Sequence, residues 1–135
     1  MLRCLIVDDS SQFLTAAQGW LERQGVAVAG VASTAAQALH QAAELRPDVV
    51  LVDIDLGRES GFEVAEQLQA ITGPDLPVIL ISAYAEEDYA ELIAASPAVG
   101  FLSKTALSAG SIRGLVQDVP GQSARRASTT GPEGT

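Results

Sequence analysis

Short apolar runs alternate with amphipathic stretches along most of the chain, and this alternation predicts a buried sheet. The runs are rich in Val, Ile and Leu and are mostly bounded by Gly, Pro or Asp, which is typical of strands covered on both faces. They span residues 2–7, 26–31, 49–52, 78–81 and 100–102. We therefore predict five strands.

Apolar residues between these runs recur at spacings of three and four, which indicates helices with one buried face. The stripes consist of Phe13, Ala17 and Trp20 or Leu21; Ala35, Ala38, Leu39 and Ala42; Val64, Ala65, Leu68 and Ile71; Ala90, Leu92 and Ile93; and Ile112, Leu115, Val116 and Val119. Thr34 with Gln37, and Ser60 with Glu63, match the capping box that begins a helix. Five helices are expected.

Strands that alternate with helices predict an α/β fold, in which right-handed crossovers cover both faces of a parallel sheet. We expect a doubly wound five-stranded parallel sheet, a flavodoxin-like (βα)5 fold with strand order 2-1-3-4-5. The predicted domain covers residues 1–119. Residues 120–135 are rich in Pro, Gly, Ser, Thr and Arg without an apolar period, and they are expected to form a flexible tail.

Composition and charge limit the classes of partner that the chain is expected to bind. The net charge of −9 and the dispersed basic residues argue against direct binding of nucleic acid, which needs clustered Lys and Arg. The sequence has no apolar run long enough for a membrane span and no signal-peptide pattern. The single cysteine, Cys4, lies within the first strand and is expected to be a small buried residue. A cytoplasmic protein is therefore expected.

Polar side chains follow the predicted strands where they end: Asp8, Asp9, Asp53, Ser82 and Lys104. The carboxyl ends of parallel strands share one edge of a sheet, so these residues should meet in one crevice. Carboxylates about 5 Å apart repel each other by roughly 3 kcal/mol per pair at an effective dielectric of about 20, so a cation is expected among them. An all-oxygen site with room for water and phosphate favours Mg²⁺, and the lack of Cys or His ligands argues against zinc.

These side chains suit phosphoryl transfer. A carboxylate whose charge is partly neutralised by a metal ion can attack phosphorus. Lys104, the only lysine in the chain, can then pair with one phosphoryl oxygen while Ser82 donates a hydrogen bond to another. The phosphorylated state would gain contacts that the free state lacks, and this difference makes a switch.

The motifs that carry these residues resemble those of response-regulator receiver domains of two-component systems. They are Val7-Asp8-Asp9, Val52-Asp53-Ile54-Asp55-Leu56, Ile81-Ser82-Ala83 and Gly100-Phe101-Leu102-Ser103-Lys104, in the family's order and spacing. The stretch of residues 26–46 is most similar to receivers of LuxR-type regulators.

The resemblance implies that Asp53 accepts a phosphoryl group from a sensor histidine kinase or phosphotransfer protein. It implies that Asp9 binds Mg²⁺ directly, Asp8 largely through water, and Asp55 through its main-chain carbonyl, with Mn²⁺ able to replace Mg²⁺. Ser82, Ala83, Lys104 and Phe101 would bind the phosphoryl group and switch. The output surface would be helix 4, strand 5 and helix 5, acting on a partner, an attached output domain or a phosphorylation-dependent homodimer.

Two positions depart from the family pattern. Thr105 follows Lys104 where receivers commonly have a proline joined through a cis peptide, and Gly57 replaces a proline after the acceptor. We expect Gly57 to loosen this loop because glycine has the most backbone freedom. The family positions that tune phosphate lifetime are Asp55 and Tyr84 here, and we expect Tyr84 to shield the acyl phosphate.

Other interpretations remain at this point. Asp8 and Asp9 could cap a helix, His40 is expected at the surface, and Trp20 and Phe13 are expected in the core. A haloacid-dehalogenase-type phosphatase is disfavoured because its Asp-x-Asp lies on the first strand. The chain is therefore not expected to be an enzyme, apart from catalysing its own dephosphorylation. A receiver-like module that signals without phosphorylation remains the main alternative, and a DNA-binding output module removed from the C-terminus is a further possibility.

Overall fold

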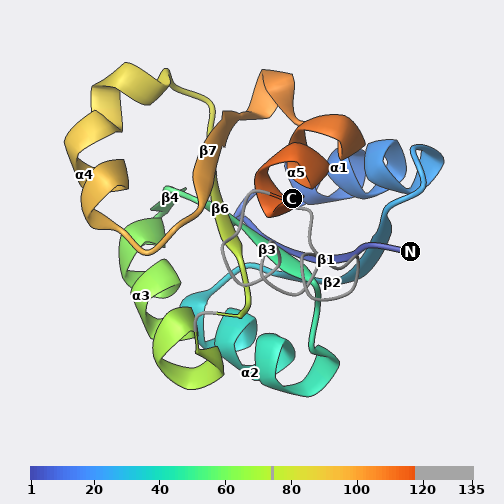
Figure 1. Cartoon of the computed structure of the whole chain (residues 1–135), viewed down its shortest axis with the longest axis horizontal. Coiled ribbons are helices and arrows are strands. Elements are labelled where there is room, and N and C mark those ends of the chain that lie inside the picture. The colour runs from blue at the N-terminus through green and yellow to red at the C-terminus, as the bar shows by residue number, and fades with distance from the viewer. Residues whose placement is uncertain (74, 118–135) are drawn as a thin grey trace, which may run out of the picture.

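Five parallel strands form the centre of the molecule in the computed structural model, which describes residues 1–73 and 75–117 (Figure 1). The strands are β1 (Arg3–Val7), β2 (Ala27–Ala32), β3 (Val49–Asp53), β6 (Val78–Ser82) and β7 (Gly100–Ser103). Their order in the sheet is β2-β1-β3-β6-β7, and each neighbouring pair is parallel. The predicted order 2-1-3-4-5 is confirmed, because β4 and β5 belong to a separate small hairpin.

Helices cover both faces of the sheet. They are α1 (Ser11–Arg23), α2 (Ala35–Leu45), α3 (Gly61–Thr72), α4 (Ala90–Ala95) and α5 (Ala109–Gln117), with short 3-10 helices η1 (Glu86–Tyr89) and η2 (Lys104–Ala106). Figure 1 shows α1 and α5 on one side of the sheet and α2 and α3 on the other. None of the helices in the described ranges is long and apolar enough to cross a membrane.

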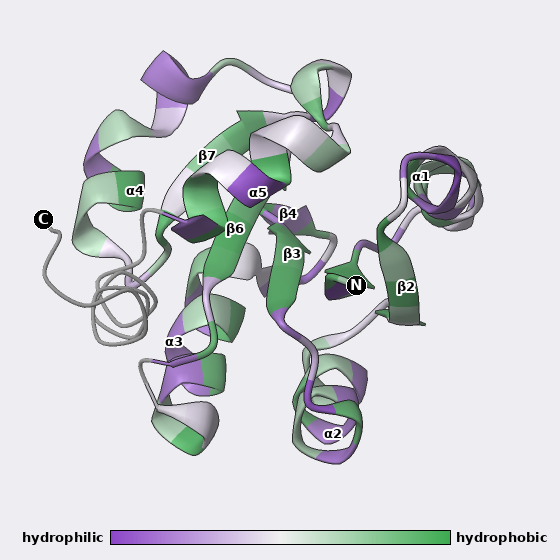
Figure 2. Cartoon of the chain, turned by 45° about the vertical axis from the view of Figure 1, so that its right-hand side comes forward, coloured by the Kyte–Doolittle hydropathy of each residue, from purple (hydrophilic) through white to green (hydrophobic). Residues whose placement is uncertain are grey.

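The strands carry apolar side chains toward both helical layers, because successive residues of a strand point to opposite faces. In β1, Cys4 and Ile6 pack toward α1 and α5, whereas Leu5 and Val7 pack toward α2 and α3. The strands are correspondingly the most apolar part of the fold in Figure 2. Cys4 is fully buried, as expected, and burial raises the pKa of its thiol to about 12, with a further contribution from the charge of Glu22.

Three large apolar residues of the predicted buried stripes lie at the surface, namely Trp20, Ile71 and Leu92. Trp20 is 40% exposed, whereas Leu21 is fully buried. The buried stripe of α1 runs through Leu14, Ala17 and Leu21, and a residue next to Leu21 is turned by about 100° away from that stripe. The prediction that Trp20 is a core residue is therefore wrong, and the alternative placement of Leu21 is confirmed.

Helix starts follow the predicted capping residues only in part. Thr34 caps α2, and its hydroxyl accepts a hydrogen bond from the Gln37 N–H at 3.2 Å, but the Gln37 amide oxygen accepts from Ser33. Ser60 caps α3 by accepting from the N–H of Phe62, not Glu63.

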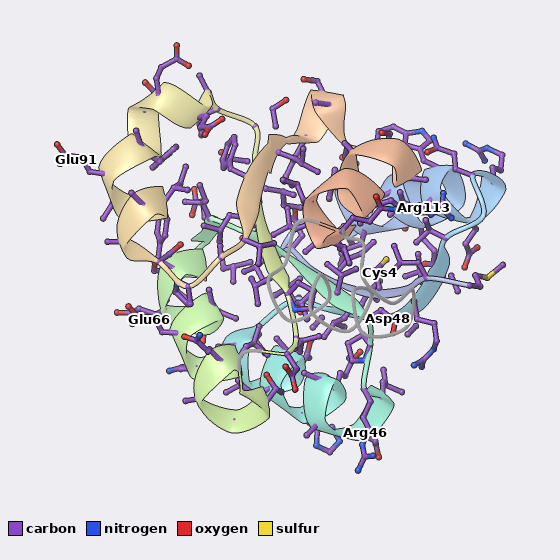
Figure 3. All side chains as sticks on the ribbon, in the orientation of Figure 1. Cys4, Arg46, Asp48, Glu66, Glu91 and Arg113 are labelled. Atoms are coloured by element: carbon purple, nitrogen blue, oxygen red, sulfur yellow. The ribbon has the colours of Figure 1, made fainter. Side chains whose placement is uncertain are left out.

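Figure 3 shows Glu66 of α3 and Glu91 of α4 pointing outward on the same side of the molecule. The domain end expected at residue 119 and the tail expected over residues 120–135 lie outside the described residues.

Candidate functional site

The predicted site residues meet at the carboxyl edge of the sheet. Asp8 follows β1 and Asp53 ends β3, and the pairing of Val7 with Val52 places these two strand ends side by side. Ser82 ends β6, and Lys104 directly follows β7. The hollow at this edge has a volume of about 270 Å³, and its lining comprises Asp8, Asp9, Ser10, Asp53, Asp55, Gly57, Ser82, Ala83, Tyr84 and Lys104.

Lys104 joins two of the carboxylates. Its Nζ lies 2.6 Å from Asp8 Oδ2 and donates a hydrogen bond to Asp53 Oδ2 at 3.1 Å. The contact with Asp8 is an ion pair without hydrogen-bond alignment, so Asp8 Oδ2 has no aligned donor within the described part of the chain. The ammonium therefore balances two buried charges at once.

Three carboxylates lie close enough to share a metal ion. One oxygen from each of Asp8, Asp9 and Asp53 lies within 4.8 Å of the others. Asp8 is fully buried and Asp53 is 6% exposed, whereas Asp9 is exposed to solvent. Hard oxygen donors with one open side suit Mg²⁺ or Ca²⁺, and the unaligned Asp8 Oδ2 leaves a lone pair for a metal-bound water. The residues present therefore fit a divalent cation.

Burial dominates the electrostatics of Asp53. The pKa of Asp53 is raised from 3.8 to about 6, mainly by burial and further by the charge of Asp8, against the lowering effects of the Asp55 N–H and of Lys104. Burial alone would lower the pKa of the Lys104 ammonium, but the pairing with Asp8 and Asp53 outweighs it and raises that pKa. Lys104 is therefore charged at neutral pH and stabilises the anionic form of Asp53.

Backbone N–H groups fix the two buried carboxylates. Asp8 Oδ1 accepts a hydrogen bond from the Ser10 N–H at 2.8 Å, and Asp53 Oδ1 accepts one from the Asp55 N–H at 3.1 Å. Ser10, rather than either aspartate, caps α1, because its hydroxyl accepts from the Phe13 N–H. The capping interpretation of Asp8 and Asp9 is therefore wrong, and Asp8 keeps its second oxygen for the site.

Ser82 lies on the other side of Asp53. It is 2% exposed, and its hydroxyl accepts a hydrogen bond from the Tyr84 N–H at 3.0 Å. Ala83 and Tyr84 are exposed and line the hollow. Phe101 does not line it: this half-buried residue of β7 packs on the core beneath α2 and α3. His40 is exposed on α2, 3.4 Å from Glu44, as expected.

A small hairpin that the apolar pattern did not predict follows Asp53. β4 (Asp55–Leu56) pairs with β5 (Glu59–Ser60) in antiparallel fashion. Gly57 has φ +72°, the conformation that the first position of a two-residue hairpin turn requires. The loosening effect expected of Gly57 thus competes with a defined turn, and the available signal was a glycine directly after Leu56.

The hairpin of β4 and β5 is also held by a contact with α2. The carboxylate of Glu59 accepts a hydrogen bond from the Ala35 N–H at 2.8 Å, in the first turn of α2. A negative charge at a helix N-terminus is favourable because the unpaired N–H groups there carry partial positive charge. The loop that follows Asp53 is thereby connected to α2.

Two further contacts escaped the sequence patterns. Gly61 lies against the main chain of Asp53, so closely that a β-carbon would overlap the Asp53 carbonyl oxygen. The ring of Phe13 lies beneath the ammonium of Lys104, with Nζ 4.3 Å from the ring centroid. Neither contact has a local signature, because Phe13 and Lys104 lie far apart in the sequence and the close approach of Gly61 depends on how α3 packs against the end of β3.

The segment after Lys104 shows how Thr105 is accommodated. The described residues contain no cis peptide bond, and Lys104 begins the 3-10 helix η2. The Thr105 hydroxyl lies 3.0 Å from that of Ser103. The peptide bond between Lys104 and Thr105 is therefore trans, and with this bond the Lys104 side chain reaches Asp53.

A larger cavity of about 450 Å³ lies at the opposite edge of the sheet, between the ends of α2 and α3. Its lining comprises Ala42, Ala43, Arg46, Pro47, Asp48, Ile71, Thr72, Asp75 and Leu76. Its lining includes neither the clustered carboxylates nor Lys104. The smaller hollow is therefore the one that contains the reactive groups.

Comparisons with known proteins agree with this geometry. Response regulator GacA of Pseudomonas viridiflava is 31% identical over 107 residues, which cover 78% of this chain and 50% of that protein. Protein-glutamate methylesterase/protein-glutamine glutaminase 2 of Caulobacter vibrioides is 39% identical over 85 residues, which cover 63% of this chain and 24% of that protein. The chain thus spans half or less of the length of these curated relatives.

A solved structure is similar over nearly the whole chain. It is a response regulator of Burkholderia pseudomallei with a phosphorylated aspartic acid, a calcium ion and citrate; it is 25% identical, with a TM-score of 0.74, and the match covers 98% of this chain and 76% of that one. The family model of the response regulator receiver domain matches residues 4–116. With this match over most of its length and an acidic hollow at the expected sheet edge, the chain belongs to the response regulator receiver domain family.

Proposed function

We propose that this receiver domain is a phosphorylation-activated switch in which Asp53 accepts a phosphoryl group from a histidine kinase or a phosphotransfer protein. A carboxylate oxygen of Asp53 attacks phosphorus, the bond from phosphorus to the imidazole nitrogen breaks, and the imidazole, which already carries a proton on its other ring nitrogen, leaves as a neutral ring. The carrying observation is the Lys104 ammonium, 3.1 Å from Asp53 Oδ2 in a hollow whose lining includes the three clustered carboxylates. This cation can stabilise the negative charge on the carboxylate before the transfer and on the phosphoryl oxygens after it.

The acidic cluster supports a divalent metal requirement. Asp8, Asp9 and Asp53 would hold Mg²⁺ through carboxylate oxygens, and the main-chain carbonyl of Asp55 would complete the protein ligands, with Mn²⁺ as a substitute. When bound, the ion supplies charge neutralisation between the acceptor and the incoming phosphoryl group. The calcium ion and phosphorylated aspartic acid of the Burkholderia pseudomallei relative support a metal beside such an acceptor.

Signal output would follow from contacts that exist only in the phosphorylated state. Ser82 can exchange its bond from Tyr84 for one donated to a phosphoryl oxygen, supported by the main chain of Ala83. Phe101, half buried in β7, would move with it and alter the surface of α4, β7 and α5. A change of about 5.5 kcal/mol between the two states is enough to move a population from 1:99 to 99:1.

The proposal includes the setting in which this switch works. Since the chain spans half or less of its curated relatives, residues 1–119 would act either alone or as the receiver part of a longer regulator. The proposed partners are a sensor histidine kinase, a downstream protein or output domain, and a second phosphorylated copy, all in the cytoplasm. The chain itself would bind neither nucleic acid nor membranes and would catalyse at most its own dephosphorylation.

The test is phosphorylation by acetyl phosphate with Mg²⁺, followed by intact-protein mass spectrometry. We expect one added phosphoryl group in the wild-type protein and in Asp88→Asn, a control at an exposed aspartate outside the hollow, and none in Asp53→Asn. A wild-type protein that gains no mass would support a module that signals without phosphorylation. Repeated turnover of a generic phosphomonoester would support a phosphatase.

A further inference from the structure

We propose that Phe13 is a positioning residue that holds the Lys104 ammonium at the acceptor carboxylate. This inference rests on the proposed function of Asp53. The ammonium lies 4.3 Å from the centroid of the Phe13 ring, while the same atom lies 3.1 Å from Asp53 Oδ2. A cation over an aromatic face is attracted by the electron density of the ring.

The ring and the buried anion come from one rigid turn. Asp8, which pairs with Lys104, accepts a hydrogen bond from the Ser10 N–H, and the Ser10 hydroxyl accepts one from the Phe13 N–H at 3.2 Å. The turn between β1 and α1 thus positions both groups that contact the ammonium, the Asp8 carboxylate and the Phe13 ring. Phe13 also packs on the core cluster beneath α1 and α5, which limits movement of its ring.

Lys104 needs such a fixed surface. A lysine side chain has four flexible carbons and loses much rotamer freedom when its ammonium is placed. The following Thr105 is exposed and lacks the ring that fixes the backbone of a proline. Phe13 therefore supplies, from helix α1, a constraint that the local sequence after Lys104 does not.

The aromatic contact differs from the ionic ones during the reaction. Phosphorylation changes the charge and the position of the oxygens on Asp53, so the contact between Lys104 and Asp53 must be remade. The ring of Phe13 carries no charge and takes no part in this exchange. It keeps the ammonium within reach of both the carboxylate and the phosphoryl oxygens.

The size of the effect follows from the exposure of Lys104. Its side chain is 18% exposed, between the fully exposed and the fully desolvated cases of a cation on an aromatic ring. Loss of the ring should slow phosphorylation of Asp53 by acetyl phosphate about threefold to tenfold.

The experiment uses the fact that Lys104 is the only lysine of the chain, so that protein made without a lysine-containing tag and labelled with ¹³C-lysine gives one set of side-chain signals. A ring beneath the ammonium shifts the ε-methylene protons of Lys104 upfield. We expect this shift in the wild-type protein and in Phe13→Tyr, and its loss in Phe13→Leu. Phe13→Met serves as a second ring-free variant should the leucine variant unfold.

The matched control is Phe62→Leu, which makes the same change at a ring that lies 6.4 Å from Tyr89 instead of near Lys104. It should keep the upfield shift and the wild-type phosphorylation rate, and Phe13→Tyr should restore both. An unshifted lysine signal in the wild-type protein, or equal phosphorylation rates in folded Phe13→Leu or Phe13→Met and wild type, overturns the inference alone. A wild-type protein that takes up no phosphoryl group overturns the proposed function, and the role of Phe13 in the reaction falls with it.

Discussion

Gly61 packs against the main chain of Asp53 so closely that no side chain fits between them. A β-carbon on Gly61 would overlap the carbonyl oxygen of Asp53 and approach the backbone of Ile54. The Gly61 N–H also donates a hydrogen bond to the Ile54 carbonyl at 2.8 Å. The first turn of α3 therefore rests directly on the strand end that carries the acceptor, and the position of Asp53 depends on this glycine.

Gly61→Ala should destabilise the protein and displace Asp53. Forcing a methyl group into close-packed backbone costs typically about 1–3 kcal/mol, and the rigid carbonyl places this site at the upper end. Urea unfolding would measure the loss, and the acetyl phosphate reaction should slow. Gly114→Ala in α5 is the matched control, because its β-carbon meets no atom within 4 Å. It should be neutral or stabilising by up to about 1 kcal/mol, and equal losses in both variants would contradict the packing argument.

Asp53 should make stability depend on pH in the metal-free protein. Its pKa in the folded state is raised from 3.8 to about 6, so the folded protein binds this proton more tightly than the unfolded chain. The contribution of Asp53 to the free energy of unfolding is therefore present below pH 3.8 and is lost as pH rises through about 6.

Asp53→Asn removes this charge and should raise the free energy of unfolding at neutral pH. Urea unfolding in EDTA at several pH values measures the difference between variant and wild type. We expect this difference to grow between about pH 4 and about pH 7. A constant difference over that range would show that burial does not raise the pKa of Asp53.

Divalent cations should stabilise the protein through the three clustered carboxylates. Binding to the folded state alone adds about 2.7 kcal/mol at a ligand concentration of about 100 times Kd. Asp9→Asn removes one of the three carboxylates and should weaken Mg²⁺ binding by about tenfold or more, measured by calorimetry and by the Mg²⁺ dependence of Tm. Asp88→Asn, at an exposed aspartate outside the cluster, should bind as wild type does; a similar loss there would point to non-specific charge effects.

Tyr84 should protect the phosphorylated state. It is 60% exposed and lines the hollow two residues after Ser82, where its ring can limit the approach of water to the acyl phosphate. Tyr84→Ala should release phosphate several times faster than wild type in a phosphate-release assay, and Tyr84→Phe should behave as wild type because the ring is kept. Unchanged release from Tyr84→Ala would remove the shielding role.

Much of the site could be predicted because its parts are local strand ends. Each of Asp8, Asp53 and Ser82 follows an apolar run that only a buried strand can satisfy, and parallel topology then places all of them on one edge. The alternative interpretation, in which Asp8 or Asp9 caps α1, is wrong because the Ser10 hydroxyl accepts the hydrogen bond at the start of this helix. Trp20 was misplaced because one residue along a helix changes the direction of a side chain by about 100°.

The sequence by itself determined the sheet order, the two apolar layers and the set of polar groups at the carboxyl edge, since periodicity and strand ends are properties of short segments. Only the tertiary structure decided that Lys104 pairs with both Asp8 and Asp53 above the ring of Phe13, and that Gly61 rests on the acceptor strand. The ion pairs join Lys104 to residues 51 and 96 positions away, and the contact of Gly61 depends on the absence of a single β-carbon. Their distances are set by the packing of whole elements against one another, which no local pattern encodes.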